Sequence, residues 1–138
     1  MRRSYVQQMA DLHTQLSDLG IAVNNSVEKA VQAYVEHDVE LAHELFSDDL
    51  SINAATVEIE KEAYRLIALQ QPVAGDLRMI FTVLHASVDL ERIGDHAVSI
   101  ARATLRKDPE EVESETLKNI IKKMAEIVHS MIEDTIKA

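Results

Sequence analysis

The 138-residue chain contains no cysteine and no tryptophan, and it has only three glycines, two prolines and two phenylalanines. The missing cysteine excludes disulfide bonds and metal sites built on thiolates. Basic residues are also scarce, since 14 Lys and Arg face 24 Asp and Glu and give a formal net charge of −10. A chain without a basic stripe is poorly suited to neutralise a phosphate backbone, so we expect no nucleic-acid partner.

Long apolar runs are missing as well. The best candidate, residues 79–84, ends at His85 and is far shorter than the roughly 18 apolar residues of a membrane-spanning helix. The N-terminal residues lead into no apolar segment of the secretory type. Together with the absence of cysteine, this predicts a cytoplasmic protein with no direct membrane insertion.

The residues that are abundant favour helices, and they are arranged with a helical period. Apolar residues recur at alternating intervals of three and four, which is typical of one face of an amphipathic helix. Three such stretches of about 30 residues, joined by short connections, predict an all-α protein with a three-helix up-down-up bundle. The stripe of the first helix consists of residues 5, 9, 12, 16, 19, 23, 27, 31 and 34.

Several residues mark where these helices begin, end and touch. Asp38 is a candidate N-cap for the second helix, and Pro72 disfavours helical geometry before it and so ends that helix. Asp76 falls in the first turn of the third helix, where a negative charge suits the helix dipole, and this helix reaches about Leu105. Gly20 interrupts the first stripe without changing its period, which predicts a close helix–helix contact there.

The C-terminal segment, residues 117–138, predicts another amphipathic helix that resembles the first. The segment before it, residues 107–116, is linker-like but offers a helix start, with Asp108 as N-cap, Pro109 in the first turn and Glu111 at the third position. The last helix is compatible with either the start of a second repeat or the completion of a four-helix bundle. A shift of 105 residues places Leu19 on Met124, Val23 on Val128, Val27 on Ile132, Glu28 on Glu133 and Val31 on Ile136.

The last helix also carries an apolar stripe, and if this helix begins a second repeat, its partners from that second bundle are missing. Such a stripe must fold back, exchange with another copy or pair with one, so we expect self-association, most simply a homodimer. The stripe consists of Ile120, Met124, Ile127 and Met131.

Acidic side chains lie in unusual positions on the second and third helices. Asp49 and Asn53 on one helix, and Glu91 and Asp95 on the other, have i, i+4 spacing beside an apolar stripe. Carboxylates buried together need protons, a cationic side chain or a metal ion. Gly94, between the two acids, costs a helix roughly 1 kcal/mol relative to alanine, and its missing side chain would leave room for a neighbouring helix or a bulky cluster.

The spacing leaves two interpretations of these acids open. Oxygen ligands on facing helices can hold metal ions, as in bundles with di-iron centres, but Arg78 and Arg92 could instead pair with the acids. No Glu-x-x-His motif occurs, and none of the six histidines lies three or four residues from another, which disfavours a ferritin-type site. Nucleophile elbows, phosphate loops and zinc motifs are also missing, so a hydrolase or a Ser-His-Asp site has no support.

Four short segments together resemble the first repeat of the PhoU family, whose members regulate phosphate uptake. These segments are HDVELA at 37–42, DDLSIN at 48–53, QQPVAGDLR at 70–78 and DLERIGDHAVSIA at 89–101. The resemblance covers the whole chain, although family members contain two such three-helix repeats.

The resemblance implies a domain organisation and a metal site. Residues 1–106 would form the first three-helix repeat, 107–116 an acidic linker or helix start, and 117–138 the first helix of an incomplete second repeat, as in a truncated or naturally shortened relative. Family members bind metal through paired acidic motifs, in some cases as multinuclear iron clusters. Glu91 and Asp95 match this pattern, whereas Asp49 is followed by the amide Asn53, so all four are implied ligands for iron or another divalent or trivalent cation.

The resemblance further implies a non-enzymatic negative regulator of phosphate homeostasis. Such a protein would contact the ATPase subunit of the phosphate ABC importer and the phosphate-sensing histidine kinase. Two other classes stay open from the residues alone, namely a metal-dependent enzyme on a carboxylate-rich bundle and a structural helical module with solvated acids.

Overall fold

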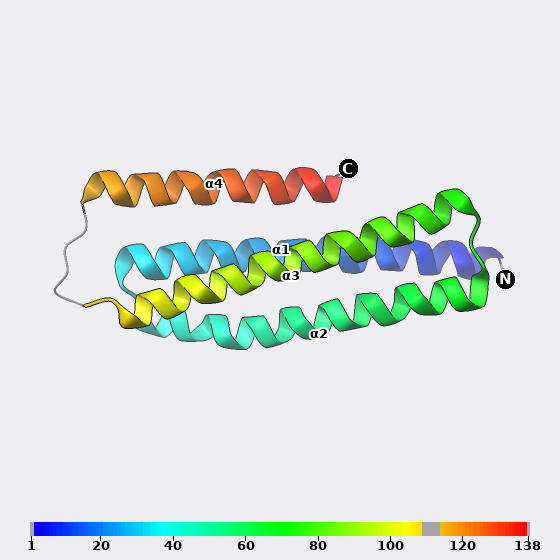
Figure 1. Ribbon diagram of the computed structural model, residues 1–138, viewed down its shortest axis with the longest axis horizontal. Helices are drawn as coiled ribbons and strands as arrows, with labels where there is room; N and C mark the ends of the chain where they lie inside the picture. Colours follow the sequence, from blue (N-terminus) through cyan, green and yellow to red (C-terminus); the bar gives the residue numbers. More distant parts are fainter. Residues whose placement is uncertain (1, 109–113, 138) are drawn as a thin grey trace.

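Four long helices make up the described part of the chain, which covers residues 2–108 and 114–137 of a computed structural model (Figure 1). The first three run up, down and up as the sequence predicts, and each contacts the other two. The helices are α1 (Arg2–Glu36), α2 (Val39–Gln70), α3 (Ala74–Arg106) and α4 (Glu115–Lys137).

The two tight connections of the bundle have the predicted chemistry. Asp38 is the N-cap of α2, with φ −90° and ψ 96°, and its carboxylate accepts a hydrogen bond of 3.0 Å from the backbone N–H of Leu41. Gln71 closes α2 in the left-handed region at φ 44°, directly before Pro72. Asp76 lies in the first turn of α3, where its negative charge interacts favourably with the positive end of the helix dipole.

The core of the bundle differs along its length. Large aliphatic side chains such as Leu12, Ile59 and Leu66 form one cluster, and a second cluster is built largely from alanines of all three helices. Small residues let helix backbones approach more closely than leucines do. The alanines of the second cluster are Ala30, Ala33, Ala42, Ala97 and Ala101.

A polar contact closes each end of the bundle. The hydroxyl of Tyr5 on α1 donates a hydrogen bond of 2.8 Å to the carboxylate of Asp76 on α3. At the opposite end, the ammonium group of Lys107 lies 4.4 Å from the ring centroid of Tyr34 and donates to the backbone carbonyl of Tyr34 at 3.2 Å. These contacts hold both ends of α1 against the ends of α3.

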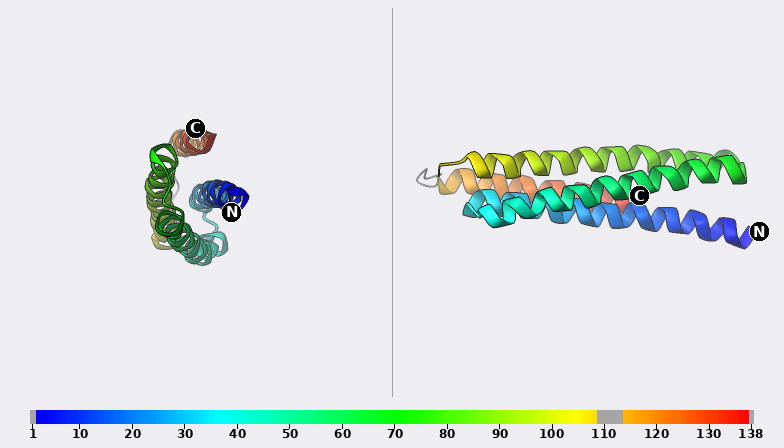
Figure 2. Two further views of the ribbon diagram at one scale, coloured as in Figure 1. Left: turned by 90° about the vertical axis from the view of Figure 1, so that its right-hand side faces the viewer. Right: turned by 90° about the horizontal axis from the view of Figure 1, so that it is seen from below.

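Helix α4 folds back along α1 and, of the described helices, contacts α1 alone (Figure 2). It therefore does not complete a four-helix bundle. A side chain at Gly20 would overlap Ile136, so the close contact predicted at Gly20 is the α1/α4 contact. One face of α4 packs on α1 through Ile132, which is 2% exposed, while the predicted apolar stripe faces away and Met124 is 60% exposed.

The N-terminal end of α4 differs in part from the predicted one. The described helix begins at Glu115, and the hydroxyl of Ser114 accepts a hydrogen bond of 3.1 Å from the N–H of Leu117. Pro109 and Glu111, on which the predicted start depends, lie outside the described residues. No helix in the described ranges has an apolar stretch long enough to cross a lipid bilayer.

Candidate functional site

The predicted ligands lie on α2 and α3, the two helices that contact each other along this side of the bundle. A Cβ atom added to Gly94 would lie 3.5 Å from Cγ2 of Ile52, so these two residues are opposite each other. Because α2 and α3 are antiparallel, this register places Asp49 near Asp95, and the charge of Asp95 indeed acts on Asp49. The same register puts Asn53 at the level of Glu91.

Burial and neighbouring charges both act on the carboxyl group of Asp49. Loss of solvent raises the pKa of its carboxyl group, and the neighbouring negative charge of Asp95 raises this pKa further. A hydrogen bond of 3.4 Å from the amide of Asn53 and the positive charge of Arg102 act in the opposite direction. The net direction is upward, so this site disfavours the ionised form of Asp49.

Two oxygen atoms at this position are buried without a hydrogen-bond partner. They are Oδ1 of Asp49 and Oδ1 of Asn53, one turn apart on α2. Buried acceptors in folded proteins almost always have a donor or a cation beside them, because leaving one unsatisfied costs about 1–3 kcal/mol. These oxygens therefore fit the requirements of a hard cation, which binds to carboxylate and amide oxygens.

The α3 side of the site is more open than the sequence predicts. Asp95 is exposed to solvent rather than at the margin of the core, and Glu91 is half-buried and forms no hydrogen bond or ion pair with a described residue. Across residues 2–108 and 114–137, no three His, Asp or Glu side chains are grouped closely enough to hold a metal ion. The structure thus brings together Asp49, Asn53 and Asp95, and it leaves Glu91 separate.

The arginines that could have neutralised these acids lie elsewhere. Arg92 pairs with Asp89 at 3.8 Å, and the side chain of Arg78 donates to the backbone carbonyl of Ala74 at 3.4 Å. The cation that acts on Asp49 is Arg102, which the sequence reasoning missed. Its position seven residues after Asp95, two helical turns along the same face of α3, is the signal that could have identified it.

Gly94 is explained only in part by the packing of α2. The added Cβ would lie 3.5 and 3.7 Å from atoms of Ile52, which are ordinary van der Waals distances. An alanine would therefore fit, and the predicted need to make room for a neighbouring helix is not what keeps this position without a side chain.

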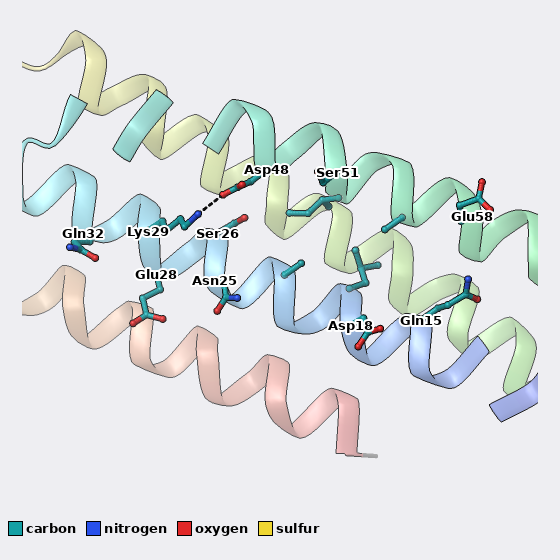
Figure 3. A pocket seen from close by; sticks show the side chains of 14 residues that line it. Gln15, Asp18, Asn25, Ser26, Glu28, Lys29, Gln32, Asp48, Ser51 and Glu58 are labelled. Carbon is teal, nitrogen blue, oxygen red and sulfur yellow. Dashed lines mark hydrogen bonds and ion pairs between the residues drawn. The ribbon is translucent and has the colours of Figure 1, made fainter. Parts of the chain in front are cut away.

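A second polar region, which the sequence did not indicate, is a cleft of about 640 Å³ between α1 and α2 (Figure 3). Lys29 on α1 reaches across it to Asp48 on α2, with an ion-pair distance of 3.0 Å, and lies 3.7 Å from Glu44. The hydrogen bond to Asp48 raises the pKa of Lys29. Asp48 and Glu44 thus already neutralise Lys29. Among the residues that line the cleft, Lys29 is the one basic side chain, against the acids Asp18, Glu28, Asp48 and Glu58.

Comparisons with known proteins agree with this architecture. Residues 16–104 match the family described as PhoU domain. The chain is 37% identical over 127 residues to the phosphate-specific transport system accessory protein PhoU homolog 1 of Mycobacterium tuberculosis, covering 92% of this chain and 58% of that protein. It is also 37% identical over 138 residues to the corresponding PhoU homolog of Clostridium acetobutylicum, covering 99% and 62%.

Solved structures show the same similarity. The phosphate transport system regulatory protein PhoU from Streptococcus pneumoniae superposes with a TM-score of 0.86 at 30% identity, over 97% of this chain and 62% of that one. PhoU from Pseudomonas aeruginosa gives a TM-score of 0.85 at 32% identity, over 94% and 61%. The chain therefore spans about three fifths of the length of these relatives.

Proposed function

The chain belongs to the PhoU family, and from this membership we propose that it negatively regulates phosphate import and phosphate-starvation signalling by protein contact. The observation that carries the proposal is the match of residues 16–104 to the PhoU domain, together with the shared fold of a phosphate transport regulatory protein. Its partners would be the ATPase subunit of the phosphate ABC importer and the phosphate-sensing histidine kinase, both reached from the cytoplasm. The protein would act without catalysis.

Copurification and a reporter together test this proposal. A tagged copy of the chain is recovered from cells grown in high and in low phosphate, while a phosphate-starvation promoter is followed in cells that lack the gene. We expect the ATPase subunit and the kinase to be recovered mainly in high phosphate, and we expect the promoter to be active in the mutant under all conditions. Normal repression in the mutant would contradict the regulatory role.

We also propose that Asp49, Asn53, Glu91 and Asp95 bind iron or another divalent or trivalent cation. The support is the pair of buried unpartnered oxygens on Asp49 and Asn53 and the nearby charge of Asp95. A cation would satisfy the oxygens and remove the repulsion between the two carboxylates. Glu91 would join the other three ligands only when the cation binds.

Thermal denaturation with and without metal tests the site. A cation that binds only the folded state must raise its melting temperature, so Fe²⁺ or Mn²⁺ should stabilise the wild type but not Asp49→Asn or Asp95→Asn. Asp89→Asn is the matched control, because it removes an exposed charge of the same helix. An unchanged melting temperature in the wild type would contradict metal binding at this site.

We further propose that the chain forms a homodimer through the exposed stripe of α4. Leu117, Ile120, Met124, Ile127 and Met131 alternate in steps of three and four and are all exposed. This is the spacing of a seam along which two helices pair. Light scattering should give twice the monomer mass for the wild type and the monomer mass for Met124→Glu, whereas a monomeric wild type would refute the dimer.

A further inference from the structure

Helices α2 and α3 each carry a row of exposed apolar side chains that the bundle core does not use. On α2 the row consists of Leu50, Val57 and Tyr64, and on α3 it consists of Phe81 and Val88, all of them between 44% and 71% exposed. The members of each row are seven residues apart. Because seven residues are close to two helical turns, each row runs nearly straight along its helix.

Both rows lie on the sides of α2 and α3 that meet at the acidic site. Val57 follows Asn53 by four residues on α2, and Val88 precedes Asp95 by seven residues on α3. These intervals are about one and two helical turns, so each row continues the line of its helix on which the acidic site lies. The two rows therefore border the same side of the bundle.

The antiparallel register of α2 and α3 sets the rows side by side. It places Val57 at the level of Val88, and Tyr64 at the level of Phe81. Among the described helices α4 contacts α1 alone, so it does not cover these residues. We call this surface, with Leu50, the outer α2/α3 face. One turn from each row, a partly buried side chain packs against the aliphatic cluster, and these two are Ile67 and Leu84.

The free charges of the outer α2/α3 face are negative. Glu60 is exposed between Val57 and Tyr64, and Glu91 is half-buried three residues after Val88. Neither carboxylate forms a hydrogen bond or an ion pair with a residue of the described ranges. Arg78 and Arg102 lie beyond the ends of the α3 row. The basic residues beside the rows are paired within their own helices, Lys61 with Glu58, Arg65 with Glu62 and Arg92 with Asp89, at 3.7–3.8 Å.

We propose that the outer α2/α3 face binds an amphipathic helix of a partner protein that carries Lys or Arg beside its apolar stripe. Rows that repeat every seven residues, or about 10 Å, match apolar side chains with the same repeat on a helix lying parallel to them. The basic side chains of that helix pair with Glu60 and Glu91. A second copy of this chain or an anionic lipid surface is a poorer match, because each brings further negative charge against these carboxylates.

This inference rests on the proposed regulation by protein contact, since it assigns the surface on which such a contact is made. The surface is also distinct from the exposed stripe of α4, through which the chain is proposed to dimerise. Partner binding and dimerisation therefore do not compete for the same side chains.

Calorimetric titration of the 138-residue chain with a synthetic amphipathic helix tests the proposal. The peptide has about 18 residues, with leucines in steps of three and four and lysines beside them, and a second peptide has glutamates in place of the lysines. A chelator keeps cations out of the acidic site. We expect saturable binding of the lysine peptide, about ten-fold or more tighter than that of the glutamate peptide, with amide chemical shifts that change in residues 50–67 and 77–91.

Variants separate this face from the general acidity and from the other exposed apolar residues of the chain. Tyr64→Ala/Phe81→Ala should weaken binding of the lysine peptide by a factor of about ten or more, because exposed aromatic residues dominate such interfaces. The matched control Ile21→Ala/Leu69→Ala removes two exposed apolar side chains outside the rows and should leave the affinity unchanged. Glu60→Gln should weaken binding several-fold. Circular dichroism of each variant verifies that it is folded.

Four results would overturn the proposal. These are the absence of saturable binding, equal affinity for the two peptides, equal weakening by the control variant, and chemical-shift changes centred on α4. A loss of self-association in Tyr64→Ala/Phe81→Ala, seen by light scattering, would also overturn it, because the face would then join copies of this chain.

Copurification from cells in high phosphate separates this inference from the proposed function. Tyr64→Ala/Phe81→Ala should recover less of the ATPase subunit or of the kinase than the wild type does, whereas Ile21→Ala/Leu69→Ala should recover the same amount. Undiminished recovery of both proteins by the first variant would overturn the docking face and leave the regulatory function standing. A wild type that recovers neither protein would contradict the regulatory function, and the peptide titration would then decide the docking face by itself.

Discussion

The three-helix bundle and α4 are both amphipathic, but they bury their apolar faces to different extents. Every helix of the bundle packs against two others and buries a full stripe, whereas α4 packs against α1 alone and buries Ile132 as its one fully covered side chain within 115–137. The two apolar faces of α4 thus differ in their exposure to solvent. One face docks on α1, and the other, centred on Met124, stays exposed. Helical periodicity alone therefore does not reveal how many neighbours a helix has.

The largest expected effect comes from removing a side chain of the bundle core. Ile59 is nearly fully buried among large aliphatic residues, so Ile59→Ala should lower the free energy of unfolding by about 2–5 kcal/mol. Urea denaturation followed by circular dichroism measures this loss. Val57→Ala, two residues away on the exposed face of α2, is the control and should change stability little.

The same substitution in α4 should act locally. Ile132 is as well buried as Ile59 and belongs to the same aliphatic cluster, but its helix contacts α1 alone among the described helices. Ile132→Ala should therefore release α4 and leave the three-helix bundle folded. Hydrogen exchange should then show lost protection in residues 115–137 and unchanged protection in α2 and α3. A loss of protection that spreads equally through the bundle would mean that the two regions unfold as one unit.

A smaller effect, of opposite sign, is expected at Gly94. Alanine fits beside Ile52 without a clash, and it favours the helix over glycine by about 0.5–1 kcal/mol. Gly94→Ala should therefore raise the midpoint of thermal unfolding of the metal-free protein. A lower midpoint would show that α2 and α3 approach each other more closely than the distances to Ile52 indicate.

The smallest expected effect concerns the pH dependence of the site between α2 and α3. Because the pKa of Asp49 is raised in the folded state, the folded protein binds its proton more tightly than the unfolded chain does. Stability is therefore lost as the pH rises from the ordinary aspartate pKa through the raised value, and the penalty persists at neutral pH.

Asp49→Asn removes this penalty and should stabilise the metal-free protein at neutral pH by less than about 1 kcal/mol, since solvent screens the site. At acidic pH, where Asp49 is protonated in both states, the variant and the wild type should be alike. Denaturation with a chelator present, at pH 3 to 7, measures the difference. A variant that is less stable than the wild type at neutral pH would mean that the folded protein stabilises the ionised carboxylate of Asp49 instead of disfavouring it.

Much of the bundle could be predicted from the sequence, because the residue patterns that specify its helices are local. The stripe of the first helix, the cap at Asp38 and the stop before Pro72 depend on neighbours within a few residues, and all three are confirmed. The contact at Gly20 was predicted correctly, but its partner Ile136 is more than 100 residues away, and only the packed structure identifies it.

The candidate site was harder to predict because burial depends on how helices rotate against each other. The rotation of α3 exposes Asp95, although its spacing predicted a position beside the apolar stripe. The same rotation determines that Arg102 acts on Asp49 while Arg92 pairs with Asp89. Spacing could thus identify Asp49 and Asn53 as partners, but it could not choose the cation beside them.

The central position of α1 has a consequence for how the chain is made. Of the described helices, α1 is the one that contacts all the others, yet it is synthesised before them. The hydroxyl group of Tyr5 can form its hydrogen bond only after Asp76, 71 residues later, has been synthesised. During translation its apolar stripe has no cover until α2 and α3 have left the ribosome. Slow translation after residue 36 would therefore prolong the exposure of the apolar stripe of α1.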